Sequence, residues 1–287
     1  MTTVPTNDKH TDDLSDQQLQ SFVDFACDLA DAAAAITLTR FRQPLPVENK
    51  LGDTGFDPVT AADRAAEKAM RELITEQYPS HGILGEEYGH SSEGSRLTWV
   101  LDPIDGTRAF ISGLPTWGTL IALYDGVMPV LGVMDQPFTA ERYLAAAGSD
   151  KTTCVHRGKE SQLSTRDCRQ LSAATMMSTA PDMFDAVEFE VQQELAGEVR
   201  LMRYGGDCYA YCMLAGGHVD LVVEAGLSTY DIQALIPIVE NAGGVVTDWQ
   251  GGSAVDGGQV LASATQELHQ QALARLQPAA KKSASIL

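Results

Sequence analysis

Hydrophobic residues recur at helical spacing near the start of the chain. Over residues 14–41 they fall three and four positions apart, which is typical of a helix with one buried face. A second helix is predicted from Thr60, because Thr60-Ala-Ala-Asp63 has the form of a capping box and the apolar pattern after it ends at Tyr78-Pro79. Proline and glycine punctuate residues 43–55, which predicts a loop between the two helices.

Short β-prone runs replace the helical pattern from residue 81 onward. Strands are predicted at residues 81–87, 99–101, 119–124, 130–134 and 142–147. After a polar stretch at 148–167 the pattern alternates, with strands predicted at 174–178, 199–203, 219–224, 245–248 and 261–263, and helices at 185–195, 209–215, 232–241 and 266–276. We therefore predict an α+β half (13–150) and an α/β half (151–278), between a disordered N-terminal tail (1–12) and a polar C-terminal tail (279–287).

Composition narrows the class of protein. The chain has 287 residues, of which 44% are hydrophobic and 21% charged, as in a folded globular protein. Its net charge of −19 argues against nucleic acid or an anionic membrane surface as a partner. The polar, acidic N-terminus does not look like a signal peptide, no run approaches the roughly 20 apolar residues of a membrane span, and the five cysteines form no CxxC pair. We predict a reduced, cytoplasmic protein.

The strongest chemical signal is Asp102-Pro-Ile-Asp105-Gly-Thr107, which follows the apolar run Trp99-Val-Leu101. Two carboxylates at a strand end repel each other, and a hard cation such as Mg²⁺, Mn²⁺ or Ca²⁺ would relieve the repulsion. Gly106 and Thr107 begin a short predicted helix, where backbone N–H groups suit an anion. Metal-assisted phosphoryl transfer needs this arrangement. A plain surface turn is the alternative, because Asp-Pro and Asp-Gly are turn-prone.

Two further acidic segments extend this candidate site. Glu86-Glu87 follows a predicted strand, and Asp231 opens a predicted helix. Carboxylates that converge from three separate elements are how a two-metal site is assembled. The alternatives are a solvated Glu87 and an Asp231 that only caps its helix.

Taken together, these segments resemble the inositol monophosphatase family of Mg²⁺-dependent phosphatases. The motifs that carry the resemblance stand in the family's order: Asp57-Pro-Val-Thr-Ala-Ala-Asp63, Gly85-Glu86-Glu87, Trp99–Thr107, Tyr230-Asp231 and Ala242-Gly-Gly244. Within the family, Tyr204–Tyr209 and Gly132–Pro137 look most like the bacterial histidinol-phosphatases. The resemblance implies a layered α-β-α-β-α sandwich with two mixed sheets, a homodimer, and two or three Mg²⁺ ions per site, with Mn²⁺ as a substitute.

The resemblance also implies a role for each site residue. The metal ligands would be Glu86, Asp102, Asp105, Asp231 and the backbone carbonyl of Ile104. Glu86 and Thr107 would activate the attacking water, and Asp57 would hold Thr107 by a hydrogen bond. The substrate would be bound by Gly106, Thr107, Gly205, Gly206, Asp207, Glu224 and Lys50, although Lys50 is equally compatible with a solvated position.

Asp207 bears on the substrate, because inositol-specific members usually carry a small neutral residue at that position. A carboxylate suits a leaving group with an ammonium and an imidazole better than a neutral ring of hydroxyls, although Asp207 is also compatible with a helix cap. The expected reaction is the hydrolysis of L-histidinol phosphate to L-histidinol and phosphate, a step of histidine biosynthesis. The alternatives are phosphatase activity on inositol 1-phosphate or on another sugar or nucleotide phosphate, and a catalytically silent metal-binding protein.

Overall fold

The computed structural model describes residues 14–44, 46–49, 58–92 and 94–281. Its larger sheet has eight strands in the order β10-β9-β8-β7-β6-β5-β3-β4. Their bounds are β3 Gly82–Gly85, β4 Gly89–Ser91, β5 Thr98–Asp105, β6 Gly118–Tyr124, β7 Pro129–Gln136, β8 Glu141–Ala146, β9 Thr152–His156 and β10 Lys159–Leu163. Only the β3–β5 pair is parallel among these strands, so the sheet is mixed. A separate antiparallel pair, β1 (Val47–Asn49) and β2 (Pro58–Thr60), precedes it.

The smaller sheet has five strands in the order β12-β11-β13-β15-β14. Their bounds are β11 Thr175–Ser178, β12 Leu201–Tyr204, β13 Leu221–Leu227, β14 Val245–Asp248 and β15 Gly258–Ser263. β11 runs parallel to β12 and β13, whereas β15 is antiparallel to both of its neighbours, so this sheet is mixed as well.

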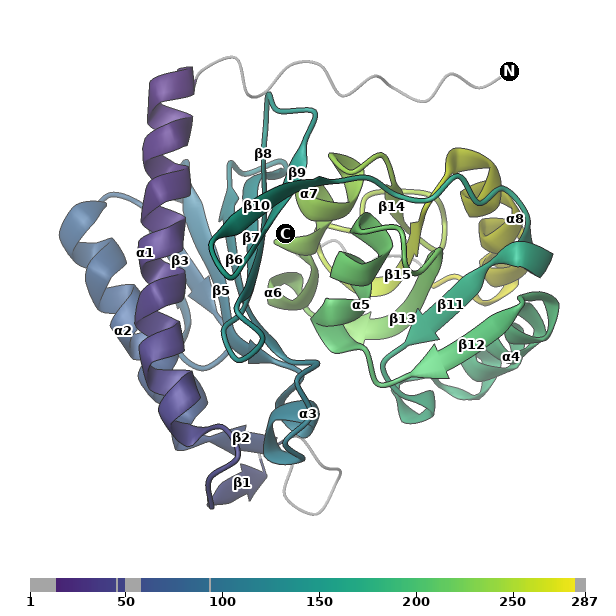
Figure 1. Cartoon of the computed structure of the whole chain (residues 1–287), viewed down its shortest axis with the longest axis horizontal. Coiled ribbons are helices and arrows are strands. Elements are labelled where there is room, and N and C mark those ends of the chain that lie inside the picture. Colours follow the sequence, from purple (N-terminus) through teal and green to yellow (C-terminus); the bar gives the residue numbers. More distant parts are fainter. Residues whose placement is uncertain (1–13, 45, 50–57, 93, 282–287) are drawn as a thin grey trace.

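Helices cover both sheets and fill the space between them, which gives five layers (Figure 1). α1 (Asp16–Arg40) and α2 (Ala61–Gln77) cover the outer face of the larger sheet, and α4 (Ala186–Glu198) and α8 (Gln266–Leu276) cover that of the smaller sheet. Between the sheets lie α5 Asp207–Ala215, α6 Thr229–Ile232 and α7 Leu235–Glu240. The remaining helical turns are α3 Thr107–Ile111, η3 Leu171–Ala173, η4 Pro181–Met183 and η5 Gln277–Ala279.

Strand alternation explains why the layers form. In β5 the side chains of Trp99 and Leu101 pack under α1 and α2, while Val100 faces the central helices. In β13 Leu221 faces the outer helices and Val222 the central ones, so both faces of each sheet are apolar. The predicted layered sandwich with two mixed sheets is confirmed.

Three sequence predictions need correction. β9 and β10 lie within the stretch 148–167 that we interpreted as a boundary, yet they pair with the larger sheet, whose last strand ends at Leu163. β10 is largely exposed and therefore lacks the apolar alternation that marks a strand. β1 falls within the predicted loop 43–55 and is exposed too. The helix predicted over 232–241 corresponds to α7, which begins only at Leu235 and follows the separate short helix α6. The N-terminal tail for which we predict disorder (1–12) lies outside the described residues.

Candidate active site

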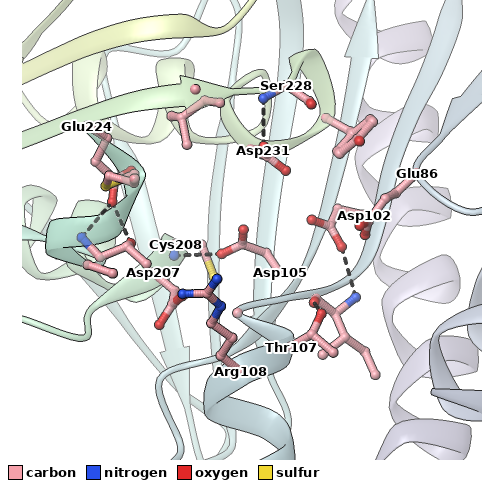
Figure 2. A pocket seen from close by; sticks show the side chains of 18 of the residues that line it. Glu86, Asp102, Asp105, Thr107, Arg108, Asp207, Cys208, Glu224, Ser228 and Asp231 are labelled. Atoms are coloured by element: carbon pink, nitrogen blue, oxygen red, sulfur yellow. Dashed lines mark hydrogen bonds between the residues drawn. The ribbon is translucent and has the colours of Figure 1, made fainter. Parts of the chain in front are cut away.

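Residues from both sheets and from the central helices line a cavity of about 400 Å³ (Figure 2). Seven of the lining side chains are acidic: Glu86, Asp102, Asp105, Asp182, Asp207, Glu224 and Asp231. Among the lining residues that the structure describes, Arg108 is the only basic one. The cavity therefore concentrates negative charge, and a ligand that enters it must bring positive charge or be accompanied by it.

The end of β5 places Asp102 and Asp105 in this cavity. The pairing of β5 with β6 is irregular between these two residues, and the side chain of Asp102 accepts a hydrogen bond from the Ile104 amide at 3.0 Å. Gly106 follows with φ = 81°, a left-handed conformation that favours glycine. The surface-turn alternative is wrong, because Asp102 is only 2% exposed.

Three carboxylates converge in the cavity. One oxygen each from Asp102, Asp105 and Asp231 lies within 4.8 Å of the others. Burial and the charges of Glu86, Asp105 and Asp231 raise the pKa of Asp102 well above its usual range, and desolvation with the neighbouring charges raises that of Asp105. Such repulsion is relieved by a cation, and an all-oxygen donor set is the one that hard divalent ions prefer. The residues present fit the predicted metal site.

Backbone amides orient the other two carboxylates as well. The Cys208 amide, in the first turn of α5, donates to Asp105 Oδ2 at 2.7 Å, and the Ser228 amide donates to Asp231 Oδ2 at 2.7 Å. Asp231 takes part in a capping box with Ser228, so capping and cavity lining occur together at this residue.

Glu86, Thr107 and Ile104 complete this end of the cavity. The Glu86 amide donates to the Leu101 carbonyl at 3.2 Å, which holds the residue beside β5, and Figure 2 shows its side chain next to Asp102. Thr107 Oγ1 donates to the Ile104 carbonyl at 3.1 Å, and Gly106 lines the cavity as well. Asp57 and Lys50 lie outside the described residues, so their predicted roles stay predictions.

Asp207 and Glu224 lie on the α5 and β13 side of the same cavity (Figure 2). Glu224 Oε1 accepts hydrogen bonds from the Thr179 amide and hydroxyl at 3.1 and 2.5 Å, and Glu224 Oε2 accepts one from Tyr211 at 2.9 Å. Burial nevertheless raises the pKa of Glu224 to about 7. Desolvation raises the pKa of Asp207 to about 6, an effect that the charge of Arg108 opposes.

Asp207 is not the cap of α5. The N-cap residue is Gly206, and Asp207 is the first helical residue, with an unusual positive φ of 46°. A non-glycine residue in this conformation is strained, and such strain is often found at functional sites. Gly205 and Gly206 form the turn before α5 and are not among the residues that line the cavity.

Four lining residues are not among those predicted from the sequence. Thr179 and Tyr211 bind Glu224, and Arg108 Nη1 lies 2.9 Å from Asp182 Oδ2. Tyr211 stands four positions after Asp207 on a predicted helix, which is a usable signal for one shared face. Arg108 directly follows the predicted phosphate-binding residues, but Asp182 lies in a short helical turn for which the sequence has no pattern.

Known proteins resemble this chain over most of its length. A sequence model of the inositol monophosphatase family matches residues 18–281. The chain is 41% identical over 276 residues to the chloroplastic bifunctional phosphatase IMPL2 of Arabidopsis thaliana, covering 92% of this chain and 78% of the relative. It is 36% identical over 254 residues to a histidinol-phosphatase of Chlorobaculum parvum, covering 88% and 95%. The solved structure of an inositol monophosphatase from Zymomonas mobilis superposes with a TM-score of 0.80 at 40% identity, covering 90% and 98%.

Proposed function

The chain belongs to the inositol monophosphatase family, and we propose that within it this protein is a Mg²⁺-dependent phosphomonoesterase that hydrolyses L-histidinol phosphate to L-histidinol and phosphate. The family consists of metal-dependent phosphatases that act on small phosphorylated molecules. The choice of substrate rests on two acidic residues of the cavity that lie apart from the carboxylate cluster, Asp207 and Glu224. Asp207 and Glu224 line the same cavity as the three carboxylates proposed to bind metal, but they are not part of that cluster. They are therefore available to bind the organic part of a substrate.

A phosphorylated amino alcohol matches the two ends of this cavity. Its phosphate would lie near Gly106 and Thr107, and its ammonium and imidazole would extend toward Asp207 and Glu224. A neutral polyol would add no positive charge beside these two desolvated carboxylates, and Arg108 compensates only Asp207, which is unfavourable. The identity to a histidinol-phosphatase supports this substrate. The likeness to an inositol monophosphatase supports the alternative, inositol 1-phosphate.

The proposed mechanism uses the chain's own groups as follows. Asp102, Asp105 and Asp231 would hold Mg²⁺ together with Glu86 and the Ile104 carbonyl. Bound Mg²⁺ would neutralise phosphate charge and acidify a water molecule. Thr107 Oγ1 donates to the Ile104 carbonyl, so its lone pairs can accept a hydrogen bond from the attacking water. The Glu86 carboxylate would orient the same water and take up its proton.

A substrate panel tests the proposal. With Mg²⁺ present we expect kcat/KM for L-histidinol phosphate to exceed that for inositol 1-phosphate at least about tenfold, since one charge-assisted contact contributes about 1.5–3 kcal/mol. Chelation should remove the activity and added Mg²⁺ should restore it. A kcat/KM no better than that of inositol 1-phosphate would sink the substrate assignment, and activity that survives chelation would contradict the metal-dependent mechanism.

Three wider expectations stay predictions. The homodimer rests on the family resemblance, and the cytoplasmic location rests on the polar N-terminus and the cysteine pattern. The absence of a nucleic-acid partner rests on the net charge of −19. Within the described residues, every helix is too short or too polar to span a bilayer. Light scattering on the purified chain would test the dimer by its mass.

A further inference from the structure

Glu67, on α2, is a fully buried carboxylate that does not line the cavity. One helical turn later on α2, Arg71 Nε donates to Glu67 Oε1 at 2.7 Å. Two more donors come from the segment that joins β3 to β4: the Glu87 amide donates to Glu67 Oε2 at 2.7 Å, and the Tyr88 amide donates to Oε1 at 3.2 Å. The carboxylate of Glu67 thus holds two consecutive amides of one turn.

The same turn encloses Glu67 from its other side. A Cβ atom on Gly85 would lie 2.0 Å from Glu67 Oε1, so only glycine allows the backbone to approach the carboxylate this closely. Arg71 also donates to the carbonyl of Gly89. The residues on both sides of Glu86 are therefore fixed on the Glu67–Arg71 pair, while the Glu86 amide itself is bound to β5.

Packing a hairpin against a helix does not require a buried charge. Apolar contacts would do so without the cost of desolvating a carboxylate and a guanidinium. What the charge adds is direction, because charge-assisted hydrogen bonds to adjacent amides are short and fix the turn in one geometry. Since Glu86 projects from this turn toward Asp102 (Figure 2), the direction of the Glu86 side chain depends on it.

We propose that Glu67 is a positioning residue: its carboxylate, held by Arg71, fixes residues 85–88 and thereby directs Glu86 into the carboxylate cluster. This inference rests on the proposed function, in which Glu86 binds metal and orients the attacking water. Groups that orient a metal ligand from behind typically affect metal affinity or activity by about 10–100-fold.

Metal binding by the full chain tests the inference without relying on turnover. Mn²⁺ is titrated into metal-stripped protein and free Mn²⁺ is followed by electron paramagnetic resonance, well below the unfolding temperature of each variant. Glu67→Gln keeps the size of the side chain but places an NH₂ group where only acceptors fit, so we expect Mn²⁺ affinity to fall about 10–100-fold. Glu72→Gln is the matched control, since Glu72 is on the same helix, is 70% exposed and pairs with Lys68 at the surface.

Three outcomes separate the possibilities. A folded Glu67→Gln protein with a lower unfolding temperature but wild-type Mn²⁺ affinity would overturn the inference, because a purely structural role predicts that result. Arg71→Gln keeps Glu67 but removes the guanidinium that holds its carboxylate, so we expect Mn²⁺ affinity to fall here too. If Glu67→Gln does not fold, wild-type Mn²⁺ affinity in Arg71→Gln would overturn the inference. Glu86→Gln is the reference variant. If its Mn²⁺ affinity equals that of the wild type, Glu86 does not bind metal and the proposed function is wrong at this residue. If its affinity falls while Glu67→Gln and Arg71→Gln keep wild-type affinity, only the positioning role of Glu67 is refuted.

Discussion

The two acidic ends of the cavity are built differently. At one end the oxygens of Asp102, Asp105 and Asp231 lie within 4.8 Å of one another, and each carboxylate accepts a hydrogen bond from a backbone amide. At the other end Glu224 is surrounded by donors from Thr179 and Tyr211, and Asp207 lies in the field of Arg108.

This difference indicates what each end is suited to bind. At the first end the three carboxylates repel one another, and ions of high charge would relieve this repulsion. The second end compensates part of its charge with protein donors, which suits a singly charged organic cation that must also leave after each turnover. The net charge of −19 therefore does not exclude a phosphate ester, because in the proposed function part of this charge would hold cations beside the phosphate.

The largest expected effect is at the metal end. Asp102→Asn keeps the shape of the side chain but removes a ligand charge, and we expect kcat to fall at least about 1,000-fold, equivalent to roughly 4 kcal/mol. The metal-free variant should stay folded and be no less stable than the wild type, because a repelling charge is gone. Steady-state kinetics and circular dichroism measure both. Asp167→Asn, at an exposed position, is the control, and retained turnover in Asp102→Asn would rule out the two-metal mechanism.

The second prediction concerns Glu224 and pH. The pKa of Glu224 is raised from 4.5 to about 7 in the folded chain, so between these values the folded protein holds a proton that the unfolded chain has lost. The unfolding free energy of the metal-free protein should therefore decrease as the pH rises from about 4.5 to 7. Glu224→Gln removes this loss, and it should be more stable than the wild type by on the order of 3 kcal/mol at pH 8 but not at pH 4. Denaturant unfolding of both proteins across this range measures the gap, and parallel pH curves would contradict the prediction.

Much of the fold was predictable because its elements have strong local signals. The capping box at Thr60 and the apolar periodicity after it predict α2, and the residues predicted for α8 are those observed. The elements that were missed, such as β10, are exposed and carry no apolar pattern. α6 and α7 are separate because Pro237 lacks the N–H that would bond to the Gln233 carbonyl in a continuous helix.

The candidate site was predictable only where it follows an element end. Asp102, Asp105 and Asp231 stand at such ends, and the structure brings them together. Asp182 could not be predicted, because its position depends on how the two sheets face each other. The role of Glu67 and Arg71 could not be predicted either, because an i, i+4 pair on a helix usually indicates a solvent-exposed ion pair. Only the tertiary structure shows that the turn after β3 packs against this pair.

The third prediction concerns Asp207, whose replacement should affect one substrate and not the other. Asp207→Asn should raise KM for L-histidinol phosphate by about 10–100-fold, because it removes a charge-assisted contact of about 1.5–3 kcal/mol to the leaving group. Hydrolysis of inositol 1-phosphate should be little affected, since its leaving group carries no positive charge. The ratio of the two kcat/KM values is the measurement. An equal loss on both substrates would mean that Asp207 acts on the metal-binding carboxylates through its position beside Gly106, where a Cβ atom would lie 3.0 Å from Asp207 Cβ, and not on the leaving group.

The smallest effect is expected at the mouth of the cavity, where Arg108 of α3 pairs with Asp182 of η4. The two side chains are 50% and 64% exposed, and exposed ion pairs contribute at most about 1 kcal/mol. Asp182→Asn should therefore change the unfolding temperature little. It should raise KM for L-histidinol phosphate about two- to fivefold, because Arg108, released from Asp182, would compete with the substrate cation for Asp207. Adding Arg108→Gln removes the competitor and should restore KM. If KM for L-histidinol phosphate is as high in the double variant as in Asp182→Asn alone, Arg108 does not compete with the substrate for Asp207.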